Sequence, residues 1–475
     1  MSFKFVDLFA GIGGFHAALA SLGGKCVYAS EIDKAASEIY LRNWGQRPDD
    51  DITKHANEFV MDVPAHDVLV GGFPCQPFSK SGLQKGMEEV RGTLFWNIAK
   101  IIKDRRPSLV LLENVRNLAG PRHLHEWNVI IHTLRELGYR VSDDPLIVSP
   151  HQIHPNFGGR PQVRERVFIA ATKIPEGTSK FNSRPVVPDL SKAMKDWNSK
   201  DWNLSKHLPL EKLTSKTKKA EVSLTESELR WIDAWDDFVV TMRKKLKDQP
   251  LPGFPIWVDE WVHSDDLEIP DGTPDWKENF LRKNSEFYTK HQRTLDAWMK
   301  RVKIKEEKLF PPSRRKFEWQ AQDARTLKET IMHFRPSGIR AKKPTYVPAL
   351  VAITQTSIIG KQSRRLTVRE AARLQGLPDW FDFVGQPNAT SYKQLGNGVN
   401  VGVVYNVLKA QVMRDVDLLA GKPALLRAIL DSPDSPDEIL SDYAKVHHGA
   451  IQDALFDVDV RADLNKSTKS PSKSA

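Results

Sequence analysis

The sequence predicts a protein of the α/β class, with a parallel, doubly wound sheet joined to a second, irregular lobe. Strand-like and helix-like segments alternate over residues 1–172, which is the rhythm of strand–helix–strand units in a parallel sheet. That rhythm stops in the middle of the chain, where nine of the 13 tryptophans fall between Trp197 and Trp319. A chain of 475 residues is also long for one compact unit, so we expect two lobes.

The first lobe begins with an apolar run at 3–9, which predicts a strand. The stretch 15–22 predicts a helix, which Gly23 and Gly24 end before a second strand at 25–30. Further strands are expected at 67–70, 108–112 and 166–171, with helical segments such as 93–103 between them.

Regular patterning returns after the middle lobe. Thr367 and Glu370 have the spacing of a capping box that opens a helix, and Gly376 can close it. Residues 391–410 then predict a turn and an apolar helix suited to packing back on the first lobe. We therefore divide the chain into a first lobe, a middle lobe, a returning segment and a polar tail expected to be disordered, at 1–172, 173–387, 388–463 and 464–475.

Composition and charge exclude several classes of protein. Apolar residues make up 40% and charged residues 27%, as in globular proteins. No window approaches the roughly 18 apolar residues of a membrane helix, so we expect a cytoplasmic protein with no membrane partner. Two cysteines, Cys26 and Cys75, are too few for a disulfide framework or a cysteine-rich zinc site, and we expect no metal ion. The net charge of +10 favours a polyanionic partner such as nucleic acid.

A glycine-rich turn lies between the first strand and the first helix. The run 7–14 holds three glycines that let a ligand approach the backbone. Glu31, 20 positions after Gly11, follows the second strand, where its carboxylate can accept hydrogen bonds from two ribose hydroxyls. His16 stands where a dinucleotide-binding turn has its third glycine, which favours a nucleoside cofactor without a pyrophosphate, such as S-adenosylmethionine. The alternative is that these glycines only make a turn.

A cysteine follows the next strand. Gly71, Gly72 and two prolines define the loop 71–79, which places Cys75 at the carboxyl edge of the sheet, where open α/β folds bind ligands. A thiol there is a candidate nucleophile. The alternative is a buried, inert cysteine, which is what we expect of Cys26 inside its apolar strand.

Two more motifs reach the same edge. Strand 108–112 delivers Glu113, a partly desolvated carboxyl whose proton affinity should rise, although a capping or ion-pair role is also open. Arg164 and Arg166 point to one face by the two-residue period of a strand. Such a pair is usually solvated or salt-bridged, but beside a thiol and a carboxylate it could grip a base carbonyl, a phosphate or Glu113.

In this order, these segments resemble the DNA (cytosine-5) methyltransferase family. The match covers about 3–172 and 364–410, and its motifs are jointly very specific: Phe-Ala-Gly-Ile-Gly-Gly at 9–14, Pro-Cys-Gln at 74–76, Glu-Asn-Val at 113–115, Gln-x-Arg-x-Arg at 162–166, Arg-Glu-Ala-Ala-Arg-Leu-Gln-Gly at 369–376 and Gln-Leu-Gly-Asn-Gly-Val at 394–399. The resemblance implies a Rossmann-like S-adenosylmethionine-dependent methyltransferase sheet, an irregular target-recognition domain, and a segment 394–407 that returns to the catalytic lobe.

The resemblance also implies a mechanism. The Cys75 thiolate adds to C6 of a cytosine flipped out of double-stranded DNA, and C5 then attacks the methyl group. Glu113 holds or protonates N3, Arg166 contacts O2, and Arg164 supports the site. We expect loop 79–92 to close over the nucleotide and a water to remove the C5 proton. The implied cofactor site consists of Phe9, Gly11, Gly13, Gly14, Glu31, Ile32, Asp51, Ile52, Leu94 and Asn397.

The implied setting is restriction-modification, in which the methyl mark protects host DNA against a partner endonuclease acting on the same site. We expect a monomer. The basic stretches 314–317 and 340–343 are candidate phosphate contacts, although a charge run can simply be a solvated face, and we expect the tryptophans of the middle lobe to form its core.

Two other functions remain open from the sequence. An RNA methyltransferase would share the catalytic parts, but the large extra lobe favours reading several base pairs of DNA. A binding module that has lost activity could keep the fold, but the intact thiol, carboxylate and arginine set favours an enzyme.

Overall fold

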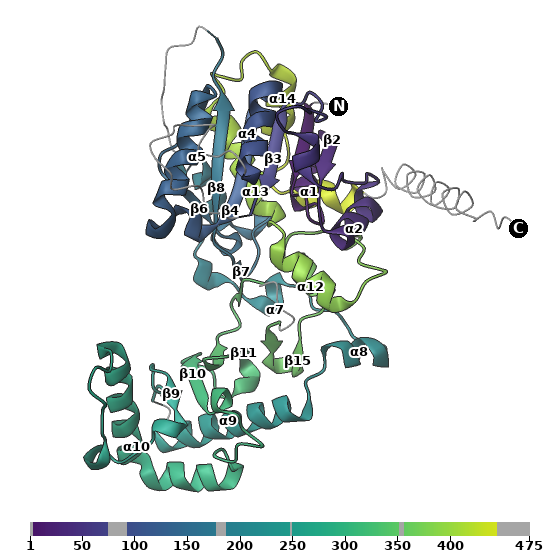
Figure 1. Cartoon of the computed structure of the whole chain (residues 1–475). Helices are drawn as coiled ribbons and strands as arrows, with labels where there is room; N and C mark the ends of the chain where they lie inside the picture. The colour runs from purple at the N-terminus through teal and green to yellow at the C-terminus, as the bar shows by residue number, and fades with distance from the viewer. Residues whose placement is uncertain (1–2, 75–92, 177–186, 248, 351–355, 444–475) are drawn as a thin grey trace, which may run out of the picture. The chain divides into compact units, whose positions relative to one another are not determined.

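The computed structural model describes residues 3–74, 93–176, 187–247, 249–350 and 356–443 (Figure 1). Its contacts divide the chain into two compact units. The first comprises 1–202, 348–353 and 368–475, and the second comprises 203–347 and 354–367. The second unit is therefore an insertion in the first.

The first unit is built on a seven-stranded sheet, which confirms the predicted α/β class. Its strand order is β2-β1-β3-β4-β8-β5, and β6 also pairs with β8. Strands β2, β1, β3 and β4 are parallel, but β8 runs antiparallel to β4. The strands are β1 (Phe3–Leu8), β2 (Gly24–Ser30), β3 (Val68–Gly72), β4 (Leu109–Val115), β5 (Tyr139–Val141), β6 (Leu146–Val148) and β8 (Arg166–Lys173).

The direction of β8 decides what lies at the carboxyl edge of the sheet. Because β8 is antiparallel, its first residue, Arg166, pairs with Val115 at the end of β4. In a parallel strand, the same residue would lie at the opposite edge. The reversal therefore brings the arginine motif to the end of the strand that carries Glu113.

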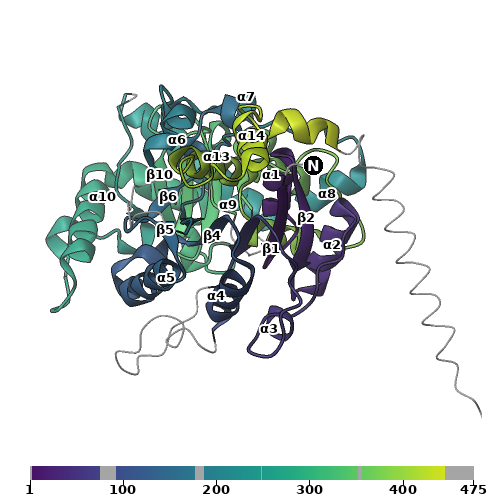
Figure 2. The same cartoon turned by 90° about the horizontal axis from the view of Figure 1, so that it is seen from above.

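Helices cover both faces of this sheet (Figure 2). Phe5, Val70 and Leu111 face one hydrophobic core, and the alternate residues, such as Val6 and Leu69, face the other. The first face packs against α1 (Gly14–Ser21), α2 (Lys34–Trp44) and α13 (Val401–Arg414), and the second against α4 (Leu94–Arg105) and α5 (Leu124–Glu136).

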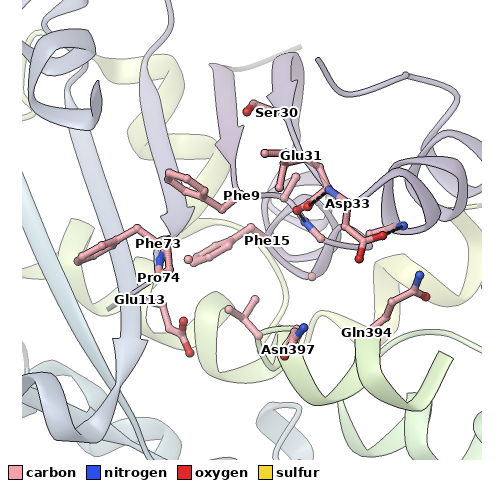
Figure 3. A pocket seen from close by; sticks show the side chains of 18 of the residues that line it. Phe9, Phe15, Ser30, Glu31, Asp33, Phe73, Pro74, Glu113, Gln394 and Asn397 are labelled. Atoms are coloured by element: carbon pink, nitrogen blue, oxygen red, sulfur yellow. Dashed lines mark hydrogen bonds between the residues drawn. The ribbon is translucent and has the colours of Figure 1, made fainter. Parts of the chain in front are cut away.

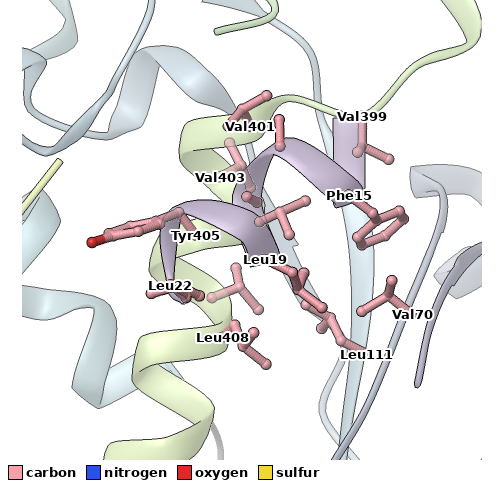
Figure 4. Packing of buried hydrophobic residues seen from close by; sticks show 14 of the residues in the cluster. Phe15, Leu19, Leu22, Val70, Leu111, Val399, Val401, Val403, Tyr405 and Leu408 are labelled. Atoms are coloured by element: carbon pink, nitrogen blue, oxygen red, sulfur yellow. The ribbon is translucent and has the colours of Figure 1, made fainter. Parts of the chain in front are cut away.

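The returning segment completes the first core. Val401 and Leu408 of α13 pack with Leu19 of α1, as Figure 4 shows. The predicted apolar helix is thus confirmed, but the turn expected before it is a helix, α12 (Asn388–Asn397). The remaining elements of this unit are α3 (Ile52–His55), β7 (Gln162–Val163), α6 (Val187–Met194), α11 (Val368–Leu374) and α14 (Pro423–Leu430).

The boundaries between units differ from those expected at 172/173 and 387/388. The indole N–H groups of Trp197 and Trp202 both donate to the carbonyl of His151, at 3.1 and 2.7 Å, which ties the segment after β8 to the first unit. The side chain of Gln375, just beyond α11, donates to the carbonyl of Leu395 at 2.8 Å. Both segments lack strand periodicity, which is why composition alone assigned them to the middle lobe. The predicted tail, 464–475, lies outside the described residues.

The second unit is more regular than the sequence predicts. A mixed six-stranded sheet has the order β15-β14-β11-β12-β10-β9. Its strands have only two to five residues, too few to reveal a two-residue period. They are β9 (Ile256–Trp257), β10 (Lys316–Gln320), β11 (Ile331–Arg335), β12 (Gly338–Lys342), β14 (Ile358–Ile359) and β15 (Arg364–Arg365). The helices are α7 (Leu204–His207), α8 (Lys216–Val222), α9 (Glu226–Lys245) and α10 (Asp275–Val302), and β13 (Val347–Pro348) lies where the first of the unit's two stretches ends.

Tryptophans form much of the core of the second unit, as expected. Trp235, Trp298 and Trp319 are at most 1% exposed, and Trp235 stacks on Phe317 with ring centroids 4.6 Å apart. Trp276, at 61% exposure, is an exception. Across the described ranges, none of the helices combines the length and apolar character that a membrane span needs.

Candidate active site

A cavity of about 600 Å³ opens in the first unit, where β1, β3 and β4 end (Figure 3). Glu113 and Arg166 line it together with nine of the ten residues predicted for the cofactor. Those nine are Phe9, Gly11, Gly14, Glu31, Ile32, Asp51, Ile52, Leu94 and Asn397. The structure thus brings the two predicted groups of side chains into one cavity.

The Glu31 carboxylate is fixed at one end of this cavity. The backbone N–H of Gly11 donates to Oε2 and that of Asp33 donates to Oε1, both at 2.7 Å. Gly11 has a φ of +55°, and a Cβ added there would meet no atom within 4 Å, so the turn needs glycine for its backbone angle. Burial raises the pKa of Glu31. Each oxygen keeps a lone pair with which it could accept a further hydrogen bond.

The other two glycines serve the packing of the protein itself. Gly13, the tenth predicted cofactor residue, is not among those that line the cavity. A Cβ on Gly13 would lie 2.1 Å from Nε1 of Trp44, and a Cβ on Gly14 would lie 2.9 Å from the carbonyl oxygen of Val399. The three glycines therefore differ: Gly11 and Gly14 line the cavity, whereas Gly13 and Gly14 also make room for neighbouring parts of the protein.

His16, which replaces the third glycine of a dinucleotide-binding turn, is a core residue. Its ring stacks on Trp44 with centroids 4.4 Å apart, and its Nδ1 lies 2.6 Å from the Tyr40 hydroxyl. The side chain fills the space that a third glycine would leave open.

Apolar side chains and one capping carboxylate form the wall next to Glu31. Ile52 and Leu94 begin α3 and α4, and Asp51 caps α3 by accepting from the N–H of Thr53 at 3.0 Å. Ile32, although it lines the cavity, is 71% exposed. This end thus offers apolar surface close to two carboxylates.

Glu113 lies at the other end, beside Arg166. Nε of Arg166 is 2.9 Å from Oε1 of Glu113, which makes the two side chains an ion pair. Glu113 is 7% exposed, and burial raises its pKa against the opposing charges of Arg166 and Arg164. This is the direction that the sequence predicts for a carboxyl at the end of a buried strand. Gly72 leaves room at Oε2, because a Cβ there would stand 3.4 Å away.

Arg164 supports the cavity from behind. It is 2% exposed and does not line the cavity. Its Nη1 donates to the carbonyl of Leu350 at 3.1 Å and its Nη2 to that of Gly398 at 2.6 Å. Burial lowers its pKa, with Arg166 adding to the effect. Since Gly398 follows Asn397, this arginine fixes the turn that carries a lining residue.

Cys75 and loop 79–92 lie outside the described residues. The chain leading to Cys75 is described, and Pro74 lines the cavity. Nδ2 of Asn114 donates to the carbonyl of Phe73 at 2.9 Å, which ties the start of this loop to the end of β4. The other cysteine, Cys26, has a pKa raised by burial to about 12, in keeping with the inert role expected of it.

Sequence reasoning missed one wall of the cavity. Thr390, Lys393 and Gln394 line it together with Asn397, and all four belong to α12. Their spacing of three, four and seven positions is that of one helix face, a signal that was overlooked because this segment was expected to be a turn. No group of three or more potential metal ligands occurs within the part of the chain that the structure describes.

Comparison with known proteins identifies the family. The family model described as C-5 cytosine-specific DNA methylase matches residues 3–412. The chain belongs to this family. A DNA cytosine-5 methyltransferase needs a methyl donor.

Several bacterial methyltransferases are similar to the chain. It is 46% identical to the Type II methyltransferase M.AluI of Cellulosimicrobium cellulans, across 91% of this chain and 97% of that protein. It is 30% identical to the Type II methyltransferase M.BanI of Aneurinibacillus aneurinilyticus, across 90% of this chain and all of that protein. The match to M.HhaI of Haemophilus parahaemolyticus, at 45% identity, covers only 35% of this chain and 48% of that protein.

Proposed function

We propose that this enzyme transfers the methyl group of S-adenosylmethionine to C5 of a cytosine flipped out of double-stranded DNA, through a covalent Cys75–C6 intermediate. The observation that supports this most is that one cavity holds both the Glu31 cradle and the Glu113–Arg166 pair. A methyl donor and a pyrimidine must lie in contact for the transfer, and a shared cavity permits that contact.

The Glu31 end fits the nucleoside part of S-adenosylmethionine. A carboxylate whose two oxygens are already oriented by backbone N–H groups can accept from two ribose hydroxyls. Ile52 and Leu94 offer apolar surface to the adenine, and Asp51 offers a carboxylate at its edge. When bound, the cofactor supplies an activated methyl group. We propose a packing role for Gly13, in place of the cofactor contact first expected.

The Glu113 end fits the cytosine. C5 of cytosine is a weak nucleophile, so the Cys75 thiolate first adds to C6. The electron pair of the C5–C6 double bond then moves toward C5 and N3, where Glu113 donates a proton and Arg166 holds O2. C5 then takes up the methyl group, whose former bonding pair stays on the donor's sulfur, and N3 returns its proton to Glu113. A water removes the C5 proton, the C5–C6 double bond re-forms, and Cys75 leaves from C6 as the thiolate. The raised pKa of Glu113 supports its part, because the carboxyl must be protonated to donate.

A base inside a duplex hides the faces that Cys75 and the methyl donor must reach. Flipping it out costs roughly a few kcal/mol, which phosphate contacts can offset. The net charge of +10 is suited to such contacts. We assign the reading of the DNA sequence to the second unit, and the protection of host DNA against a partner endonuclease to the enzyme as a whole. The names of its Type II relatives support this setting.

One experiment tests the proposal directly. Bisulfite sequencing of a plasmid recovered from cells expressing the chain should show one sequence motif methylated at C5 of cytosine. DNA that carries 5-fluorocytosine at that motif should form an adduct with the protein that survives denaturation, because the fluorine cannot leave as the proton does. If the enzyme methylated transfer RNA and left the plasmid unmethylated, the RNA alternative would be favoured and the proposal refuted.

A further inference from the structure

The sheet of the second unit has two unlike faces. Phe317 and Trp319 of β10, with Ile339 of β12 and Met332 of β11, belong to a hydrophobic core shared with α9 and α10. Successive side chains of a strand point to opposite faces, so the residues between them lie on the other side. That side is occupied mainly by charged and polar groups.

Cations from three strands gather on this second face, which we call the basic face. Its residues are Lys316 and Glu318 of β10, His333 and Arg335 of β11, and Arg340 and Lys342 of β12. In the register of the sheet, Arg340 stands opposite both Glu318 and His333. Lys342 follows Arg340 by two positions in β12, so the period of the strand places both cations on this face.

A single carboxylate in the described sheet balances these cations. Nε of Arg340 lies 2.7 Å from Oε2 of Glu318. Lys342 lies over the ring of Tyr346 at 3.9 Å, and Lys316 lies over that of Trp257 at 5.6 Å. In the described ranges, neither lysine forms an ion pair, and neither does the exposed Arg335.

Burial, and after it the neighbouring positive charge, lowers the pKa of two residues of the basic face. Burial and the charge of Arg340 lower the pKa of Lys342 to about 8. Burial, followed by the charges of Lys342, Arg335 and Arg340, lowers the pKa of His333 to about 3. Holding the cations together is thus unfavourable in the free protein, and a bound polyanion would relieve that cost.

Other basic residues expected to contact phosphate have internal partners. Arg314 lies 5.0 Å from the ring centres of both Trp231 and Phe334. Arg315 pairs with Asp259 at 2.8 Å, and Lys343 pairs with Asp323. These contacts leave the basic face as the stronger candidate.

We propose that the basic face binds the sugar-phosphate backbone of duplex DNA, with Lys316, Arg335 and Lys342 as phosphate ligands and Glu318 holding Arg340 in place. We choose DNA as the partner because its phosphates carry the charge opposite to that of the basic face. The strand register fixes the spacing of the cations. The inference rests on the proposed function, because it names the surface by which the same enzyme holds the same substrate.

The test uses the full chain with the double variant Arg335→Gln/Lys342→Gln. Fluorescence anisotropy with a labelled duplex gives the association constant at several salt concentrations. Removing two phosphate contacts should make the slope of log affinity against log salt shallower by roughly 2, and weaken binding near 0.1 M salt by roughly tenfold per charge. The matched control is Arg293→Gln/Lys300→Gln on the exposed side of α10, which removes the same charge and should leave the slope unchanged.

Two further measurements distinguish a failure of the basic-face proposal from a misfolded variant or a failure of the proposed function. Lys342→Arg keeps the charge and should keep the slope, and an unaltered melting temperature with unaltered S-adenosylmethionine binding shows that a variant is folded. If the wild-type chain methylates duplex DNA and the double variant keeps its slope, the basic face is refuted while the function stands. If the wild-type chain methylates no DNA, the proposed function itself fails. An equal loss in the control, or a loss seen only with RNA, also overturns the inference.

Discussion

The two ends of the cavity each hold a carboxylate, but in opposite ways. Glu31 has a backbone N–H at 2.7 Å on each oxygen, whereas Glu113 has the charged guanidinium of Arg166 at 2.9 Å from Oε1. Neutral donors hold an acceptor in place and leave it ready to accept again. A buried carboxyl beside a cation has a proton affinity that can change as charge develops on a ligand. The comparison teaches that burial alone does not define a role, because the partners of each oxygen decide between holding and reacting.

The largest effect is expected at the Glu113 end, from the loss of the proposed nucleophile. Cys75→Ser should lower the rate of methyl transfer by at least about 10³-fold while leaving S-adenosylmethionine affinity within about twofold, since the Glu31 end is intact. Tritiated methyl incorporation and calorimetry measure the two quantities. Cys26→Ser is the matched control and should retain activity. Appreciable turnover by Cys75→Ser would refute the covalent route.

Glu113→Gln should come next, with kcat lower by roughly 10²–10⁴-fold and cofactor affinity little changed. Single-turnover kinetics on duplex DNA would measure the first and calorimetry the second. If cofactor affinity collapsed with kcat, the division of the cavity into a holding end and a reacting end would be wrong.

The same variant should alter the pH dependence of stability. The folded protein raises the pKa of Glu113 above 4.5, so it keeps a proton that the unfolded chain releases. Stability should therefore fall as pH rises from about 4.5 through the folded pKa. Glu113→Gln removes that contribution, so urea unfolding should show the variant gaining stability relative to the wild type over this range. Parallel curves at every pH would contradict the raised pKa.

Glu31→Gln tests the cofactor end of the cavity. It should weaken S-adenosylmethionine binding by roughly 10–100-fold, since one charge-assisted hydrogen bond contributes about 1.5–3 kcal/mol. At saturating cofactor, kcat should stay within a few-fold of the wild type. Initial rates over a range of cofactor concentrations separate the two constants, and a large fall in kcat at saturation would place Glu31 in the chemistry.

The smallest effects concern the glycine turn. Gly11→Ala should cost roughly 1 kcal/mol of stability for its positive φ, because no atom stands in the way of the methyl group. Gly13→Ala should cost more, since its Cβ would collide with the Trp44 indole as well. Denaturant unfolding of both variants checks the order, and equal losses would show that backbone angle alone explains the turn.

The sequence predicted β1, β2, β3, β4 and β8, because each is a largely apolar run beside a chemical motif, but it missed the three-residue strands β5 and β6. It predicted the residues of β8 but not its direction, since neither apolar pattern nor length distinguishes a parallel from an antiparallel neighbour. The meeting of Glu113 and Arg166, which the sequence analysis offered as one of several possible contacts, depends on that direction.

The second unit shows the opposite case. Its sheet joins β9 to β10, which are about 60 residues apart, and each strand is too short to reveal a period. In the first unit, the glycines at 396 and 398 likewise made the segment of α12 resemble a turn. The C-terminal end of this helix is nevertheless helical, and the side chain of Gln375 donates to the carbonyl of Leu395 there. Long-range pairing and tertiary packing, which local sequence does not encode, decide these elements.

The placement of α13 has a consequence for biosynthesis. Strand β8 ends at Lys173, yet the helix that covers its inner face begins at Val401, after the whole inserted unit has been made. A ribosome adding about 5–20 residues per second needs on the order of tens of seconds to cover that interval. The part of this face that α13 covers, beside α1 and α2, therefore stays exposed in the nascent chain until the late segment is made. The cavity is likewise incomplete until α12 has been made, because Thr390, Lys393 and Asn397 form one of its walls.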